Sequence, residues 1–251
     1  MTVTKSVDIL EVFIVSSLIA FLVTPFVRVV ASKTGYLDKP QNNKIHAHFT
    51  PLLGGVAIFL ALFIGIISQW DVIKLHRFNN QITSMLTAMT LLLVLGLIDD
   101  KIGMEPDIKL FGQFVAAMIL FKSGVKITFL ENYYLNLFLT YFWIIGMTNS
   151  FNLLDNMNGL SAGVAVISSF FFGVIACMDG QHIVAIIAFC VCGASLGFLR
   201  HNFPKASIFM GDAGSLVIGF VLSAIAIMGN WRSLGLATSL AVPILVLAYP
   251  I

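Results

Sequence analysis

The sequence predicts an all-α fold, a helical bundle that crosses a membrane several times. Of its 251 residues, 59% are hydrophobic and only 10% are charged, which is typical of an integral membrane protein. The apolar residues form continuous runs of about 20, long enough to span a bilayer as helices. They do not alternate with polar residues as the strands of a transmembrane barrel do. The net charge of +2 is too small to indicate a nucleic-acid partner.

About nine transmembrane helices are expected along a single membrane domain covering 1–251. The first run lacks a convincing signal cleavage site, so it is interpreted as a span. The fourth is the weakest prediction because Lys122 and Lys126 lie near its end. The predicted spans are 9–31, 53–70, 80–98, 108–126, 133–151, 160–178, 182–199, 213–230 and 234–251.

The loops between these spans fall into two groups. One group, 32–52, 99–107, 152–159 and 200–212, is rich in Asp, Asn, His, Gly and Pro, whereas the other is short and plain. Span counting puts the rich loops on one face of the membrane. Ionisable groups at membrane depth usually bind an ion, a substrate or a proton, so this face is predicted to carry a polar reaction site.

The orientation follows weakly from the basic residues. Eight Lys and Arg lie near the motif-bearing face and six lie near the other. The positive-inside rule therefore favours a cytoplasmic position for the motif-bearing face of this multi-pass protein.

Asp99 and Asp100 follow the apolar run LLLVLGLI. Adjacent carboxylates point in different directions, so one can face a metal while the other accepts a proton or orients Lys109. A solvated helix end is the plainer interpretation. An acidic pair at a helix C-terminus opposes the macrodipole, however, so helix stability does not account for it.

Polar residues recur at every third position in NSFNLLDNMNG, namely Asn149, Asn152, Asp155 and Asn158. On a helix, neighbours at this spacing share a face. Their amides and carboxylate suit recognition of a base and a sugar, or a metal's oxygen shell. Helix capping and interhelical hydrogen bonds remain the alternative.

Asp212 lies between two glycines in FMGDAGS, directly before a predicted span. An Asp here can be a simple N-cap. The same geometry binds phosphate through free N–H groups, and a carboxylate at a phosphate site implies a bridging divalent cation. Phe209, one turn earlier, is placed to stack on a base, although packing is the commoner role of such a Phe. His46, in the segment HAH, is a weaker candidate for metal binding.

Together these segments resemble the polyprenyl-phosphate N-acetylhexosamine-1-phosphate transferases of glycosyltransferase family 4, which includes phospho-N-acetylmuramoyl-pentapeptide transferase. The matching segments are DKPQNNKIHAHFTPLLGGVAI, GLIDDKIGMEPDIKLFGQ, NSFNLLDNMNGLSAG and FLRHNFPKASIFMGDAGSLVIGF.

The resemblance implies an enzyme that transfers HexNAc-1-phosphate from a UDP-N-acetylhexosamine to undecaprenyl phosphate in the membrane lipid. The products are undecaprenyl-diphospho-sugar and UMP, at the start of cell-envelope polysaccharide synthesis, with Mg²⁺ or Mn²⁺ as cofactor. A homodimer is compatible with the sequence, which does not fix the oligomeric state.

Carried over by position, Asp99 or Asp100 would deprotonate or orient the lipid phosphate, and Asp212, with Asp155, would hold the metal. The nucleotide site would be lined by Asn149, Asn152, Asp155 and Asn158, with Phe209 against uracil. Lys109 would balance charge beside the acidic pair, and His46 would contact phosphate or the lipid headgroup.

Two departures from the family pattern stand out. Asn158 replaces a frequent second Asp, which favours base recognition there over metal binding. The final run ends within apolar residues at Ile251, whereas the family continues into a His-containing loop and one or two helices. The chain is therefore expected to lack that C-terminal segment and to be inactive or nearly so by itself.

Three other functions remain open, of which a noncatalytic lipid-binding scaffold would not need both the DD pair and the GD turn. The muramoyl-pentapeptide transferase is the nearest, although KIHAHFTPLLGG favours the simpler HexNAc branch. An ion-coupled transporter would also place acids at membrane depth, but it predicts them deep within spans and often a pseudo-repeat. Here the acids cluster at one face beside glycine turns.

Overall fold

The computed structural model describes residues 9–38, 49–76, 78–128, 130–229 and 231. Over these residues the all-α prediction is confirmed, with one two-residue antiparallel strand pair in which Leu37 lies opposite Pro51. The elements in chain order are α1 (Ile9–Thr34), β1 (Leu37–Asp38), β2 (Thr50–Pro51), α2 (Gly54–Ser68), α3 (Trp70–Leu75), α4 (Asn79–Ile102), α5 (Pro106–Lys122), α6 (Tyr133–Leu154), α7 (Leu160–Met178), α8 (His182–Asn202) and α9 (Gly211–Met228).

Eight of the nine predicted spans coincide with helices. Among the described residues, α1, α4, α6, α7, α8 and α9 are long and apolar enough to cross a membrane, and α2 is apolar but has only 15 residues. The chain is thus a multi-pass membrane protein. The ninth predicted span, 234–251, lies outside the described residues.

The fourth predicted span, 108–126, is wrong at its C-terminal end. Helix α5 has 17 residues and ends at Lys122. It ends there because Gly124 follows with a φ of 98°. A positive φ interrupts a helix, and glycine adopts it without steric cost. The short helix α3 was also missed. Gln69 separates it from α2, so the predicted span 53–70 is interrupted before its last residue.

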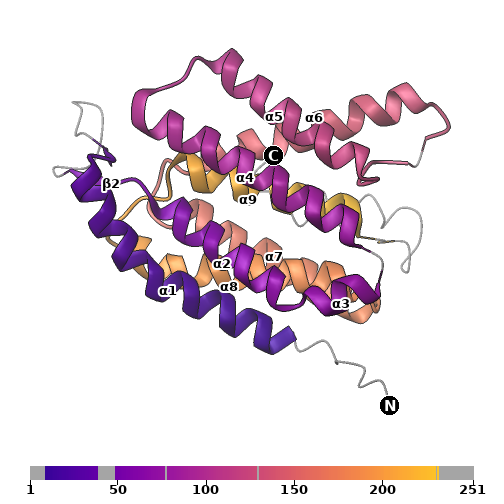
Figure 1. Cartoon of the computed structure of the whole chain (residues 1–251), viewed down its shortest axis with the longest axis horizontal. Coiled ribbons are helices and arrows are strands. Elements are labelled where there is room, and N and C mark those ends of the chain that lie inside the picture. The colour runs from indigo at the N-terminus through magenta and orange to yellow at the C-terminus, as the bar shows by residue number, and fades with distance from the viewer. Residues whose placement is uncertain (1–8, 39–48, 77, 129, 230, 232–251) are drawn as a thin grey trace.

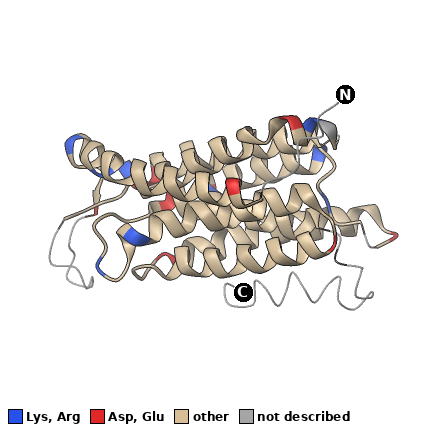
Figure 2. Cartoon of the chain, turned by 90° about the horizontal axis from the view of Figure 1, so that it is seen from below, with Lys and Arg blue, Asp and Glu red and all other residues tan. Residues whose placement is uncertain are grey.

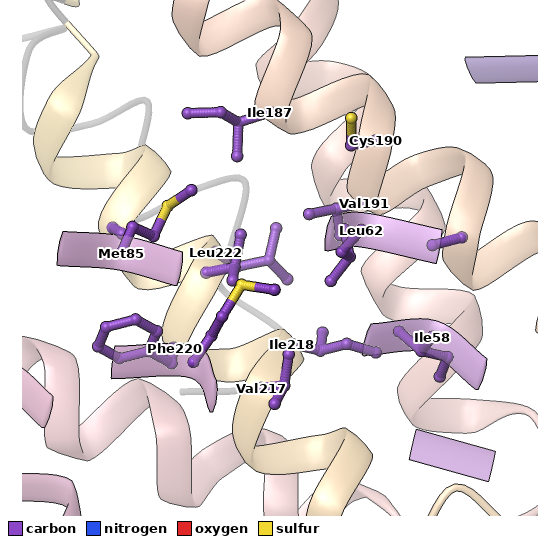
Figure 3. Packing of buried hydrophobic residues seen from close by; sticks show 14 of the residues in the cluster. Ile58, Leu62, Met85, Ile187, Cys190, Val191, Val217, Ile218, Phe220 and Leu222 are labelled. Atoms are coloured by element: carbon purple, nitrogen blue, oxygen red, sulfur yellow. The ribbon is translucent and has the colours of Figure 1, made fainter. Parts of the chain in front are cut away.

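Helix α9 forms the centre of the bundle (Figure 1). It packs against α2, α4, α6, α7 and α8, and 15 of its 18 residues are buried. A helix that is apolar on every side is expected at such a position. Figure 3 shows Ile218 and Leu222 of α9 among side chains from α2, α4 and α8.

Glycines let the neighbouring helices approach α9 closely. A Cβ on Gly55 of α2 would clash with the backbone of Gly214, and one on Gly96 of α4 would clash with the backbone of Ala213. Small residues at helix contacts are the usual means of tight packing in membranes, because lipid provides no hydrophobic drive for helix association. The start of α9 is therefore fixed against α2 and α4.

Most charged residues lie toward the two ends of the bundle, with a few nearer its middle, as Figure 2 shows. At one end the motif-bearing loops come together. The Nζ of Lys101, at the end of α4, donates to the carbonyl of Thr34 at the end of α1 over 2.6 Å, and Asn158 donates to the carbonyl of Pro204 over 3.3 Å. The predicted gathering of these loops on one face is confirmed.

Candidate active site

Four chain segments converge at the motif end of the bundle. Helix α4 supplies Asp99 and Asp100 from its last turn, and Gly103, with a φ of 70°, ends it. Helix α5 then begins with Pro106 at its first position, which suits the fixed φ of proline. Lys109 follows one turn later. The end of α6 supplies Asn152, and the start of α9 supplies Asp212.

Lys109 contacts oxygens from three other segments of the site. Its Nζ lies 2.8 Å from Oδ2 of Asp99 and 2.5 Å from Oδ2 of Asp212, and it donates to Oδ1 of Asn152 over 3.1 Å. The Lys109 and Asp99 side chains are 15% and 11% exposed, whereas Asp212 is 32% exposed. Of the two carboxylates that contact Lys109, Asp212 is therefore the more exposed to solvent.

The amide of Asn152 holds Asp212 in place. Its Nδ2 donates to Oδ1 of Asp212 over 2.6 Å and to Oγ of Ser215 over 2.9 Å. Ser215 in turn donates to the carbonyl of Gly211 over 3.1 Å. The side chain of Asp212 is thus oriented from both α5 and α6. Ser215 lies one turn after Asp212 on α9.

The two adjacent carboxylates of α4 do face different partners, as expected. Asp99 accepts from the N–H of Met104 over 2.7 Å and pairs with Lys109. Asp100 accepts from the backbone N–H groups of Asp212 over 2.8 Å and of Ala213 over 3.2 Å.

Asp100 therefore caps a helix other than its own. Its negative charge lies at the N-terminus of α9, where free N–H groups and the macrodipole favour an anion. Gly211, with a φ of 72°, has no room for a side chain because a Cβ there would come 2.6 Å from Oδ2 of Asp100. Since both Asp100 oxygens are engaged, Asp99 is the member of the pair that faces the cluster around Lys109.

Asn149 meets a partner that the sequence interpretation missed. Its Nδ2 donates to Oε1 of Gln113 over 2.5 Å, and Nε2 of Gln113 donates back over 3.1 Å. Gln113 is buried on α5, one turn beyond Lys109 on the same helix face. A lone glutamine in the apolar run FGQFVAAMILF was the available signal. The pair joins α5 to α6 next to the cluster.

Asp155 follows the last residue of α6 and is half-buried. Burial, with the nearby carboxylates of Asp212 and Asp100, raises the pKa of Asp155 above its usual range, and the backbone N–H of Gly211 opposes this. Asp155 thus also lies close to the start of α9.

The other predicted nucleotide-site residues lie on the loops beside α9. Nδ2 of Asn158 bonds Pro204, and its Oδ1 is buried with no hydrogen-bond partner among the described residues. Phe209 is half-buried, and its backbone N–H donates to the carbonyl of Pro51 over 2.7 Å. His46 lies outside the described residues.

A buried asparagine that the sequence interpretation missed holds this loop region together. Oδ1 of Asn202 accepts from the N–H of Gly159 over 2.7 Å, and its Nδ2 donates to the carbonyl of Ile208 over 3.0 Å. The chain before α7 and the chain before α9 are thereby joined. Nothing in the spacing of Asn202 distinguished it from a helix-end residue.

Oxygen atoms suited to a metal converge on Lys109. In the described part of the chain, no group of three or more His, Cys, Asp and Glu residues is arranged to hold a metal ion. Two carboxylates and one amide do share a single cationic atom, however. Hard divalent cations prefer such oxygens, and Mg²⁺ commonly uses only one or two carboxylates with water and substrate phosphates.

The fold and the site define a multi-pass membrane protein with an acidic, amide-rich centre at one end of its helices. The model of "Glycosyl transferase family 4" matches residues 82–230, which include the whole cluster around Lys109. The chain belongs to this family of transferases, so the resemblance drawn from the motifs is confirmed.

Named relatives agree with this membership. The chain is 33% identical over 256 residues to a probable undecaprenyl-phosphate N-acetylglucosaminyl 1-phosphate transferase of Bacillus subtilis, covering 98% of this chain and 70% of the relative. It is 31% identical over 231 residues to a decaprenyl-phosphate N-acetylglucosaminephosphotransferase of Mycobacterium tuberculosis, covering 83% and 57%. It is 30% identical over 237 residues to a phospho-N-acetylmuramoyl-pentapeptide-transferase of Bacillus cytotoxicus, covering 86% and 72%.

Proposed function

We propose that the protein transfers HexNAc-1-phosphate from a UDP-N-acetylhexosamine to undecaprenyl phosphate, giving undecaprenyl-diphospho-sugar and UMP. The supporting observation is the convergence of Asp99, Lys109, Asn152 and Asp212 at one end of a membrane bundle. A soluble nucleotide and a lipid phosphate can meet only at such an end. The names of the Bacillus subtilis and mycobacterial relatives support the same chemistry.

The bond changes define what the site must do. An oxygen of the lipid phosphate attacks the β-phosphorus of the sugar nucleotide, and the bond from that phosphorus to the bridging oxygen breaks, so that UMP leaves. Asp99 is the base in this proposal, because its Oδ2 faces the cluster and contacts the displaceable side chain of Lys109, whereas both oxygens of Asp100 accept from the backbone of α9. It accepts the proton that a monoanionic lipid phosphate carries.

We propose Mg²⁺ or Mn²⁺ as the cofactor. The oxygens of Asp99, Asn152 and Asp212 fit it, because they already surround one positive charge and are held by the neighbouring chain. When bound, the metal would neutralise the diphosphate and stabilise the leaving UMP. Asp155, near Gly211, is a further candidate ligand on the other side of Asp212.

The nucleotide is proposed to lie over the loops before α7 and α9. Asn158 has one carbonyl oxygen buried without a partner among the described residues, and such an acceptor suits an N–H of a uracil ring. Phe209 supplies the stacking face in this proposal. The assignment of His46 to phosphate or headgroup binding stays a prediction from the sequence.

The motif end is proposed to face the cytoplasm of a bacterial cell, in its inner membrane. UDP-sugars are made in the cytoplasm, and eight of the 14 Lys and Arg residues lie on this side. A single cysteine at position 206 in a cysteine-free variant should resist an impermeant thiol reagent added to intact cells. Labelling from outside would contradict the orientation.

The direct test uses purified protein in lipid nanodiscs with undecaprenyl phosphate and either UDP-[³H]GlcNAc or UDP-MurNAc-pentapeptide carrying the same label. Label is expected in the lipid phase only from the HexNAc donor, with one UMP released per lipid product. Transfer from the pentapeptide donor alone would favour the activity for which the Bacillus cytotoxicus relative is named. No transfer from either donor would contradict the proposal.

A further inference from the structure

Lys109 occupies the position that the proposed metal would need. Its ammonium has three hydrogens, and three oxygens surround it: Oδ2 of Asp99 at 2.8 Å, Oδ2 of Asp212 at 2.5 Å and Oδ1 of Asn152 at 3.1 Å. Every donor of the ammonium is thus matched by one acceptor, and these acceptors are the same oxygens that suit a divalent cation.

The oxygens of Asp99, Asn152 and Asp212 form an oxygen cage that a metal and the ammonium cannot occupy together. A Mg²⁺ ion lies about 2.1 Å from an oxygen ligand, so an ion on Oδ2 of Asp212 would lie less than about 5 Å from Nζ of Lys109. Two positive charges at that separation repel strongly where the dielectric constant is low. Together the two carboxylates and the ammonium carry one net negative charge, which attracts a divalent cation only weakly.

Each residue of the oxygen cage has a second hydrogen-bond partner that holds it if the ammonium leaves. Asp99 is held by the N–H of Met104, Asp212 by the amide of Asn152, and Asn152 by Ser215. The polar contacts recorded for the Lys109 side chain are with these three oxygens alone among the described residues. Its four-carbon stem is flexible, so the ammonium can leave while the cage keeps its shape.

We propose that Lys109 is a resident cation that a divalent metal displaces. It neutralises the oxygen cage while the metal is absent and leaves the cage when the metal enters. The freed ammonium then turns to the diphosphate of the sugar nucleotide. This inference rests on the proposed function for its final step, but the competition between lysine and metal requires only the cage.

A permanent structural ion pair would behave differently. If Lys109 served only to hold Asp99 and Asp212 together, its removal would loosen the cage and weaken metal binding. If Lys109 is instead a displaceable cation, its removal should strengthen metal binding, because the oxygens are then free for the metal. Metal affinity therefore separates the two roles without reference to catalysis.

The test is a titration of Mn²⁺ into the purified, metal-free protein in nanodiscs, followed by the loss of the free-ion signal in electron paramagnetic resonance. Lys109→Met keeps the apolar stem and removes the charge. Lys109→Arg keeps the charge and should bind Mn²⁺ like the wild type. Lys101→Met is the matched control, since Lys101 lies at the same end of the bundle but bonds the carbonyl of Thr34.

Lys109→Met is expected to bind Mn²⁺ at least about tenfold more tightly than the wild type, with Lys101→Met within about twofold. With UDP present, the same variant should lose nucleotide affinity. Equal or weaker Mn²⁺ binding by Lys109→Met, or no Mn²⁺ binding by any variant, would overturn the inference. Label transfer by the wild type in the same nanodiscs tests the proposed function separately, so either can fail without the other.

Discussion

The two ends of the bundle use polar side chains in different ways. At the motif end, hydrogen bonds join residues far apart in the chain, such as Lys109 with Asp212 and Asp100 with Ala213. At the opposite end, most polar bonds of the described side chains are local, although the N–H of Ile127 donates to Oγ1 of Thr140 in α6. Nδ1 of His76 bonds the carbonyl of Val72, and Asn132 accepts from the N–H of Leu135.

Local bonds at the plain end complete helix termini, which any helix needs. Long-range bonds between charged groups do not serve that need, and burying such groups is costly in a membrane protein. The contrast teaches that long-range polar contact, rather than polarity alone, marks the working end. His76 and His182 at the plain end lie with ring centroids 5.8 Å apart, yet they are exposed and join no such network in the described residues.

The largest expected effect comes from Asp212→Asn, which keeps shape but removes a charge from the cage. The rate of transfer should fall by at least about a hundredfold, as is usual when a metal or acid–base role is lost. Asp179→Asn, at the plain end, is the matched control and should stay within about twofold. Equal rates for the two variants would remove the distinction between the ends.

Substitution of the two adjacent carboxylates of α4 should affect different quantities, the transfer rate for Asp99 and the melting temperature for Asp100. Asp99→Asn is expected to lose rate about a hundredfold with little change in melting temperature, because its role lies in the chemistry. Asp100→Asn should lower the melting temperature, since it weakens two charge-assisted bonds worth about 1–3 kcal/mol each at the start of α9. Its rate should fall by only about tenfold. Thermal unfolding in detergent and initial rates measure both, and a reversed pattern would contradict the assignment of Asp99 as base.

The pair formed by Gln113 and Asn149 should contribute to stability more than to rate. Gln113→Leu leaves the half-buried amide of Asn149 with only the carbonyl of Ile145 as a partner and should cost about 1–3 kcal/mol. Replacing both residues by Leu should cost less than the sum of the single changes, because no polar group is then stranded. Additive losses in this cycle would mean that the two amides act independently.

The smallest effect on catalysis is expected from Phe209→Ala. Stacking is shared by the ground state and the transition state, so KM for the UDP-sugar should rise while kcat changes little. Base stacking is worth about 1–3 kcal/mol, which corresponds to a rise of about five- to a hundredfold. A fall in kcat with KM unchanged would assign Phe209 a packing role instead.

Much of the fold was predictable because continuous apolar runs in a membrane protein can only be helices. Helix ends were less accurate, since Gly124 and Gln69 end helices by local conformation within apolar surroundings. The gathering of the four polar loops followed from counting spans, which needs no knowledge of packing.

The individual contacts of the site could not be predicted in the same way. That Asp100 binds the start of α9, and that Gln113 meets Asn149, depends on how helices distant in sequence are rotated against one another. A hydropathy pattern records which residues avoid water, but it does not record which polar partner each side chain will meet.

The central claim is that the motif end transfers a phosphosugar rather than a sugar. UDP-GlcNAc labelled with ³²P at the β-phosphate, incubated with undecaprenyl phosphate and the protein in nanodiscs with Mg²⁺, follows that phosphorus directly. The predicted result is ³²P in the lipid phase with unlabelled UMP in solution, and loss of both with Asp212→Asn but not with Asp179→Asn. Label that remains in solution as UDP while sugar enters the lipid, or transfer that is unaffected by Asp212→Asn, would contradict it.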